Sequence, residues 1–152
     1  MNLLEDRIKE LSSYINSFID IGNSFEDSVE SCIRIIHQNL PVDNSGIFSR
    51  MTKCNSLSDD LSYVILCIQN KKNEIDKSLK EKKDPKFTLL IRSGRPSTQA
   101  VECEIRATNS EISELENTLL KFENICEYLY HLDKCLDRYI YSLKDLAQYV
   151  RK

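Results

Sequence analysis

Apolar side chains recur along this chain at alternating spacings of three and four residues, which is the period of one helical face. Over the first forty residues this register extends for about five heptads, and only Gly22 vacates a position in it. Asn2 stands three residues before Glu5, an N-cap pairing, and the residue before Pro41 avoids helical angles. The pattern therefore predicts a first coiled-coil segment over residues 2–39.

A connector and a second heptad segment follow. Residues 41–55 contain proline, aspartate, asparagine and glycine in close succession, which is typical of a connector. Ser56 and Asp59 then form a second capping pair ahead of a renewed apolar register, which only Lys71 interrupts. We therefore expect a second coiled-coil segment over residues 56–83.

The second segment is predicted to end at a further connector, residues 84–96. This stretch begins with Asp84-Pro85 and ends with the run Ser93-Gly94-Arg95-Pro96, the strongest helix breaker in the chain. Asp84 and Pro85 could alternatively cap a short helix over 86–92, because proline is well tolerated in the first helical turn.

Residues 97–152 contain neither glycine nor proline. Their apolar register is lost only at Thr108 and Asp133, and a single polar core position is tolerated in coiled coils. We expect one continuous helix, because a fold-back at residues 131–134 would need a turn made without glycine, proline or asparagine, which is unfavourable. A bend over residues 131–134, around Asp133, is the alternative.

These segments predict an all-α protein, an extended coiled coil of three heptad-bearing helical segments. The apolar seam of such a helix is the surface that other coiled-coil chains bind. The predicted partner-binding seam consists of Leu4, Ile8, Leu11, Ile15, Phe18, Leu61, Ile68, Ile75, Val101, Ile105, Ile112, Leu115, Leu119, Phe122, Leu129, Leu136, Ile140 and Leu143.

Amino-acid composition excludes further classes of fold and partner. The 152 residues include only three Gly and three Pro, too few for the many turns of a β-sandwich or a Rossmann domain. The net charge of −3 makes nucleic acid an unfavourable partner, and no run approaches the roughly 20 apolar residues of a membrane span. Six cysteines without a CxxC motif indicate reduced thiols and hence a cytoplasmic or nuclear location.

No arrangement of residues predicts a reaction. His131 and Cys135 lie four residues apart, with Cys126 nearby, but a zinc site needs four converging ligands. The many carboxylates lie on the outer faces of the predicted helices, where burial cannot tune an acid–base pair. We predict no catalytic, cofactor-binding or metal site and no small-molecule substrate.

Two surface features have more than one interpretation. The lysine-rich end of the second segment could pair with the acidic start of the third, although exposed pairs contribute little and solvated faces are the simpler expectation. The acidic residues concerned are Glu102, Glu104, Glu111, Glu114 and Glu116. Five tyrosines in the last 25 residues could be half-buried by a partner or could flank an internal core; they are Tyr128, Tyr130, Tyr139, Tyr141 and Tyr149.

The order of these segments resembles the coiled-coil region of central-channel nucleoporins. The likeness covers about residues 57–152 and includes the run Phe87–Ile91, the signature Ile112–Asn117 and the terminal stretch Leu143–Lys152. It implies a non-enzymatic scaffold subunit of a coiled-coil heterotrimer or larger assembly, located at the nuclear pore and involved in nucleocytoplasmic transport. Because the chain has no Phe-Gly dipeptide, the resemblance implies a scaffold rather than a permeability barrier. A coiled-coil subunit of a vesicle-tethering or kinetochore complex is the alternative.

Overall fold

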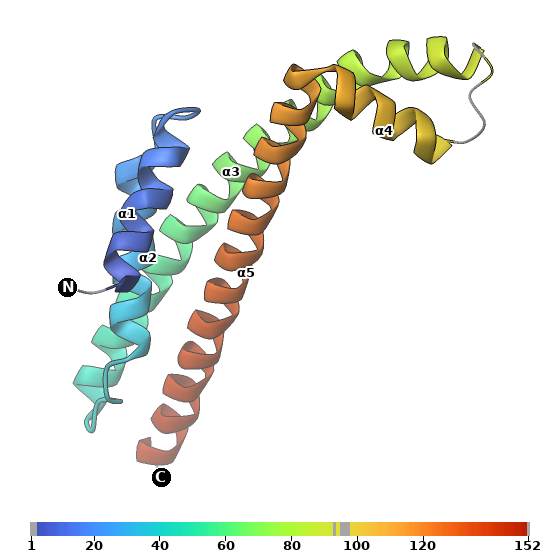
Figure 1. The fold of residues 1–152 in the computed structure, drawn as a ribbon. Coiled ribbons are helices and arrows are strands. Elements are labelled where there is room, and N and C mark those ends of the chain that lie inside the picture. The colour runs from blue at the N-terminus through green and yellow to red at the C-terminus, as the bar shows by residue number, and fades with distance from the viewer. Residues whose placement is uncertain (1–2, 93, 95–97, 152) are drawn as a thin grey trace. The chain divides into compact units, whose positions relative to one another are not determined.

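The computed structural model describes residues 3–92, 94 and 98–151, and over these residues it contains α-helices and no β-strand (Figure 1). In chain order the helices are α1 (Leu3–Asn16), α2 (Gly22–Ile36), α3 (Asn44–Arg92), α4 (Thr98–Thr108) and α5 (Ser110–Arg151). The all-α prediction is confirmed. The finer expectation, an extended coiled coil of three segments, stays a prediction, and several predicted helix boundaries are wrong.

The helices build two compact units. The first unit consists of residues 1–67 together with residues 126–152, and the second of residues 68–125. α1 and α2 belong to the first unit and α4 to the second, whereas α3 and α5 contribute residues to both.

Each helix of the first unit buries one apolar face. The buried residues include Ile8 and Ile15 of α1; Phe25, Val29, Cys32 and Ile35 of α2; Ile47, Cys54, Leu57, Leu61 and Val64 of α3; and Leu129, Leu132, Leu136, Ile140 and Leu143 of α5. Full burial of a large apolar side chain contributes about 1.5–3 kcal/mol, so this shared core is the main source of the unit's stability.

The predicted helix over residues 2–39 is broken between α1 and α2, which lie side by side and run in opposite directions (Figure 1). The Gly22 N–H donates a hydrogen bond to Asn16 Oδ1 at 2.7 Å, and the buried Ser12 hydroxyl donates to the Gly22 carbonyl at 2.7 Å. A Cβ atom at Gly22 would lie 2.3 Å from Asn16 Nδ2. Glycine thus permits the tight fold-back, and the apolar register that seemed continuous belongs to two helices.

Most of the connector predicted over residues 41–55 is helical, because α3 begins at Asn44. Asp43 caps this helix: its Oδ1 accepts a hydrogen bond from the Gly46 N–H at 2.7 Å. Ile47 is buried in the first turn, so the helix start also gains from packing. The turn-forming residues that predicted a loop therefore act as a helix start.

The second segment does not end at residue 83, and the connector predicted over 84–96 is largely helical, because α3 passes through Pro85 to Arg92. Proline inside a helix costs about 3 kcal/mol, since it removes one backbone hydrogen bond and crowds the preceding turn. Beyond it, Phe87 and Leu90 pack against the core of the second unit, which offsets this cost.

α3 ends near the predicted Ser93–Pro96 breaker. Gly94 has φ of +84°, a left-handed conformation that favours glycine, and its N–H donates to the Ile91 carbonyl at 3.0 Å. The other three residues of the breaker lie outside the described residues.

The predicted continuous helix over residues 97–152 is interrupted at Asn109, which separates α4 from α5. Asn109 is an N-cap: its Oδ1 accepts a hydrogen bond from the Ile112 N–H at 3.0 Å. The alternative bend over residues 131–134 is also wrong, because α5 is helical through this stretch. Residues 97 and 152 of the predicted segment lie outside the described residues.

The second unit has its own core. Leu79 of α3, Val101 and Ile105 of α4, and Ile112 of α5 form a buried cluster. The half-buried side chains packed against it are Phe87, Leu90, Leu115 and Leu119.

Candidate protein-interaction surface

The seam predicted to bind partners is mostly buried within this single chain. Its buried members are Ile8, Ile15, Leu61, Ile68, Ile75, Val101, Ile105, Ile112, Phe122, Leu129, Leu136, Ile140 and Leu143. Leu11, Leu115 and Leu119 are half-buried, whereas Leu4 and Phe18 are exposed by 42% and 39%. Most residues of the predicted seam therefore do lie on buried apolar helix faces. That these faces bind other chains stays a prediction.

The C-terminal tyrosines divide between the two interpretations. Tyr139 is buried, and its hydroxyl accepts a hydrogen bond from Arg50 Nη1 at 2.6 Å and donates to the Gln38 carbonyl at 3.5 Å. Arg50 Nη1 also donates to the Asn39 carbonyl at 3.1 Å, so this group fastens the α2–α3 turn to α5. The other four tyrosines are exposed on α5.

Charge pairing between the predicted basic and acidic stretches does occur in the second unit. Lys83 Nζ lies 3.3 Å from Glu116 Oε1 and 3.9 Å from Glu102 Oε1, and Lys82 pairs with Glu111. Arg106 completes the group by binding Glu116 at 2.6 Å. Lys82 and Glu111 are exposed, whereas the side chains of Lys83 and Glu116 are each only 20% exposed. Pairs that water still reaches contribute modestly, so this group serves mainly to select which faces meet.

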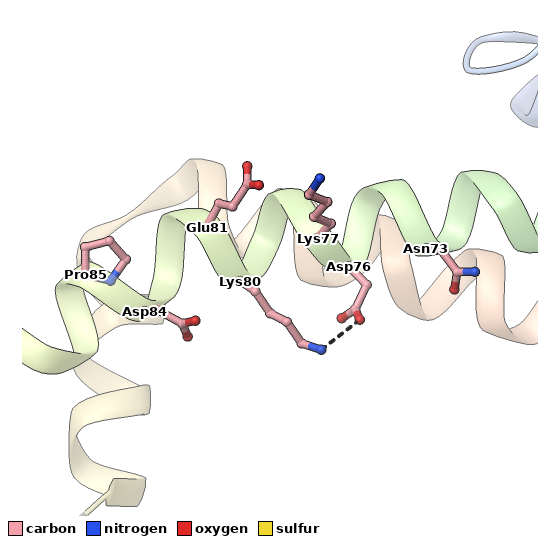
Figure 2. Close-up of a pocket in the computed structure, with 7 residues that line it drawn as sticks. All are labelled: Asn73, Asp76, Lys77, Lys80, Glu81, Asp84 and Pro85. Carbon is pink, nitrogen blue, oxygen red and sulfur yellow. Dashed lines mark ion pairs between the residues drawn. The ribbon is translucent and has the colours of Figure 1, made fainter.

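A polar hollow lies on the outer side of α3 in the second unit, shown in Figure 2. It is lined by Asn73, Asp76, Lys77, Lys80, Glu81, Asp84 and Pro85. Lys80 Nζ pairs with Asp76 Oδ2 at 3.2 Å, and the two remaining acidic side chains project to different sides of the helix. Mixed charges along this solvated stretch of α3 match neither a polyanion nor a buried acid–base pair.

The buried thiols of the first unit have low reactivity. Burial raises the pKa of Cys32 to about 12, and the negative charge of Asp133 adds to the effect. Burial likewise raises the pKa of Cys54. Because the thiolate is the reactive form, both cysteines behave as small core residues.

Neither a metal-binding cluster nor a bilayer-spanning helix is found in the described part of the chain. There, no group of three histidine, cysteine or acidic side chains is arranged to hold a metal ion; His131 is exposed while Cys126 is buried. None of the helices so described has the length and apolar content that a bilayer-spanning helix needs.

One helix face of the first unit is exposed and nearly free of charge. We define the α3 outer stripe as Phe48, Thr52, Asn55, Asp59, Ser62, Tyr63 and Leu66, all of them exposed. It lies on the side of α3 opposite the buried Cys54, Leu57, Leu61 and Val64. The exposed fractions of Phe48, Tyr63 and Leu66 are 74%, 58% and 54%, and Asp59 is the one charged member.

The outer face of α5 in the same unit provides a contrast. Its exposed positions carry Glu127, Lys134, Arg138, Tyr141 and Asp145, a face that water solvates well. Protein interfaces are depleted in charged residues at their centre. Both faces expose aromatic side chains, but the α3 outer stripe has one charged residue whereas the α5 face has several. The stripe is therefore the candidate docking surface.

The sequence does not predict this stripe because its first part falls in the predicted connector and because most of its inner positions are polar. The available signal was the spacing: positions 48, 52, 55, 59, 62 and 66 alternate by four and three residues. Apolar residues at both ends and uncharged residues at most inner positions complete the pattern.

In comparisons with known proteins, no family model, curated protein or solved structure matches the chain.

Proposed function

We propose that this protein is a non-enzymatic helical scaffold subunit, and that a helix of a neighbouring subunit docks on the α3 outer stripe. The observation that carries the proposal is the exposure of Phe48, Tyr63 and Leu66 on a face with one charged residue. A partner helix with the same spacing would bury all three side chains in one continuous contact.

The energetics favour one contact among several. Burying three large exposed side chains contributes about 1.5–3 kcal/mol each when burial is complete. Association costs about 4–15 kcal/mol in lost rotational and translational freedom. A single stripe therefore gives a weak complex, and stable attachment comes from several such contacts within an assembly, which is how scaffold subunits are held.

The partner class follows from the heptad spacing. We propose other coiled-coil proteins as partners, in a heterotrimer or larger assembly, with neither nucleic acid nor a small-molecule substrate. The resemblance of residues 57–152 to central-channel nucleoporins makes the nuclear pore the leading assembly and nucleocytoplasmic transport the leading role. A vesicle-tethering or kinetochore complex is the alternative, and a nuclear-rim rather than a vesicle or spindle location would distinguish them.

Site-specific photo-crosslinking in cells tests the docking surface. A photoreactive phenylalanine derivative replaces Thr52 in the stripe or, as the matched control, Lys134 on the outer face of α5. The proposal predicts a defined protein adduct from position 52 that disappears when Leu66→Asp is added, and none from position 134. Absence of an adduct at position 52, or the same adduct from both positions, would refute it.

A further inference from the structure

The α3 outer stripe is complementary to itself when one copy is reversed. Its layers, at positions 48, 52, 55, 59, 62 and 66, span about 27 Å at 1.5 Å per residue. In an antiparallel pair whose two helices cross at the level of residue 57, Phe48 faces Leu66 of the second copy and Thr52 faces Ser62 of the second copy. Both ends of such a contact are apolar and its middle is polar.

The central layer of this pair brings a hydrogen-bond donor to the one charged residue of the stripe. Asn55 faces Asp59 of the second copy, and by symmetry the same pair forms twice. The asparagine amide donates hydrogen bonds and the carboxylate accepts them, so the one charged residue of the stripe meets a donor. Charge-assisted hydrogen bonds are about twice as strong as neutral ones, which favours this register.

A parallel pair in register lacks this complementarity. It places Asp59 against Asp59 of the second copy, and two like charges at a partly desolvated position repel. The residues of the stripe therefore disfavour a parallel pair of helices and favour an antiparallel pair.

We infer that the helix docked on the α3 outer stripe is α3 of a second copy of this chain, in antiparallel orientation. The inference rests on the proposed function, because it names the occupant of the same surface. The contact is short compared with standard interfaces, so the dimer exchanges with monomer over an accessible concentration range. A symmetric dimer of this kind presents every other face of the scaffold twice, in opposite directions.

Sedimentation equilibrium of the purified full chain, from about 1 to about 500 μM, tests the occupant. The average mass is expected to rise from one copy toward two. Phe48→Asp and Leu66→Asp should each raise the dissociation constant at least about tenfold, because each places a charge in an apolar layer. Tyr141→Asp, an equally drastic change at an exposed site on α5, should leave it unchanged. Circular dichroism confirms that each variant folds.

Asn55→Lys tests the orientation. In the antiparallel dimer the introduced ammonium faces Asp59 of the second copy, so association should strengthen about threefold or more. In a parallel dimer two introduced lysines would face each other and association would weaken, which overturns the antiparallel inference.

The remaining outcomes separate the inference from the proposed function. A dimer that Tyr141→Asp disrupts and Leu66→Asp does not would overturn the second-copy inference. A chain that stays monomeric at every concentration would overturn it too. An adduct from position 52 to a different protein would then preserve the proposed function, whereas no adduct from that position would overturn both.

Discussion

Replacing Gly22 with alanine should destabilise the fold by about 1–2 kcal/mol, although alanine is normally the better helix residue. Gly22 is the first residue of α2, and the preceding Ile21 offers no side-chain cap. Asn16, at the end of α1, takes over this role by accepting the Gly22 N–H at 2.7 Å. An alanine Cβ would lie 2.3–2.6 Å from the terminal atoms of Asn16, so this side chain must move and the hydrogen bond is lost.

The magnitude combines two opposing effects. Leaving a buried backbone N–H without its acceptor costs about 1–3 kcal/mol. Reducing the freedom of the unfolded chain by replacing glycine with alanine returns about 0.4–1 kcal/mol. For a chain of this length, each kcal/mol of lost folding stability lowers the melting temperature by about 2–4 °C.

Urea denaturation followed by circular dichroism measures the effect, and a double-mutant cycle with Asn16→Ala checks its cause. When Asn16 has already been truncated, neither the steric conflict nor the hydrogen bond remains to be lost. Gly22→Ala should then be neutral or stabilising. Equal destabilisation in both backgrounds would refute the assignment of Asn16 as the group that requires glycine.

Three further predictions concern caps, charges and thiols. Asn109→Ala should destabilise the chain by about 1 kcal/mol in urea denaturation because α5 loses its N-cap, whereas Asn109→Ser should retain most of the stability. Burial, reinforced by Asp137, raises the pKa of Asp133, so the native state holds this proton more tightly than the unfolded chain does. Stability attributable to Asp133 therefore falls as pH rises through the raised pKa; Asp133→Asn should be more stable than the parent at pH 7, and the difference should vanish in acid below both pKa values. Cys32, with its pKa near 12, should react with iodoacetamide at pH 8 at least about 100-fold more slowly than the exposed Cys103, a difference lost in denaturant, as mass spectrometry can show.

The apolar register predicts most of this fold because burial depends on helical periodicity, which the sequence displays directly. Leu61, Ile68, Leu129 and Leu136 lie in the predicted seam and are buried. What the register does not encode is the direction of the chain beyond a break. A helix that turns back at Gly22 can keep its apolar residues in step by coincidence, so the pattern alone reads as one long helix.

Helix ends were predicted less well because one residue type serves two purposes. Asp43 and Asn109 are good loop residues and equally good N-caps, and only the presence of a following packed turn decides between these roles. The sequence predicts a helix stop at Pro85 because proline inside a helix carries a high local cost. The packing of Phe87 and Leu90 in the second unit, which outweighs that cost, depends on residues distant in the sequence.

The candidate surface was the least predictable feature. An exposed stripe of threonine, asparagine and serine between Phe48 and Leu66 carries little hydrophobic signal. Its importance emerges only when the opposite face of α3 is known to be filled by this chain's own core. Exposure of an aromatic residue becomes informative once the buried alternatives are accounted for.

Hydroxyl-radical footprinting of the assembly isolated from cells tests the central claim most directly. The tagged chain, purified alone and diluted until it is monomeric, and the chain purified with its bound subunits are oxidised briefly. The modification of individual side chains is then compared by mass spectrometry. Docking on the α3 outer stripe predicts that Phe48 and Tyr63 become protected in the assembly while Tyr141 reacts equally in both samples. Unchanged reactivity of Phe48 and Tyr63 alongside protection of Tyr141 would contradict the claim and place the interface on α5.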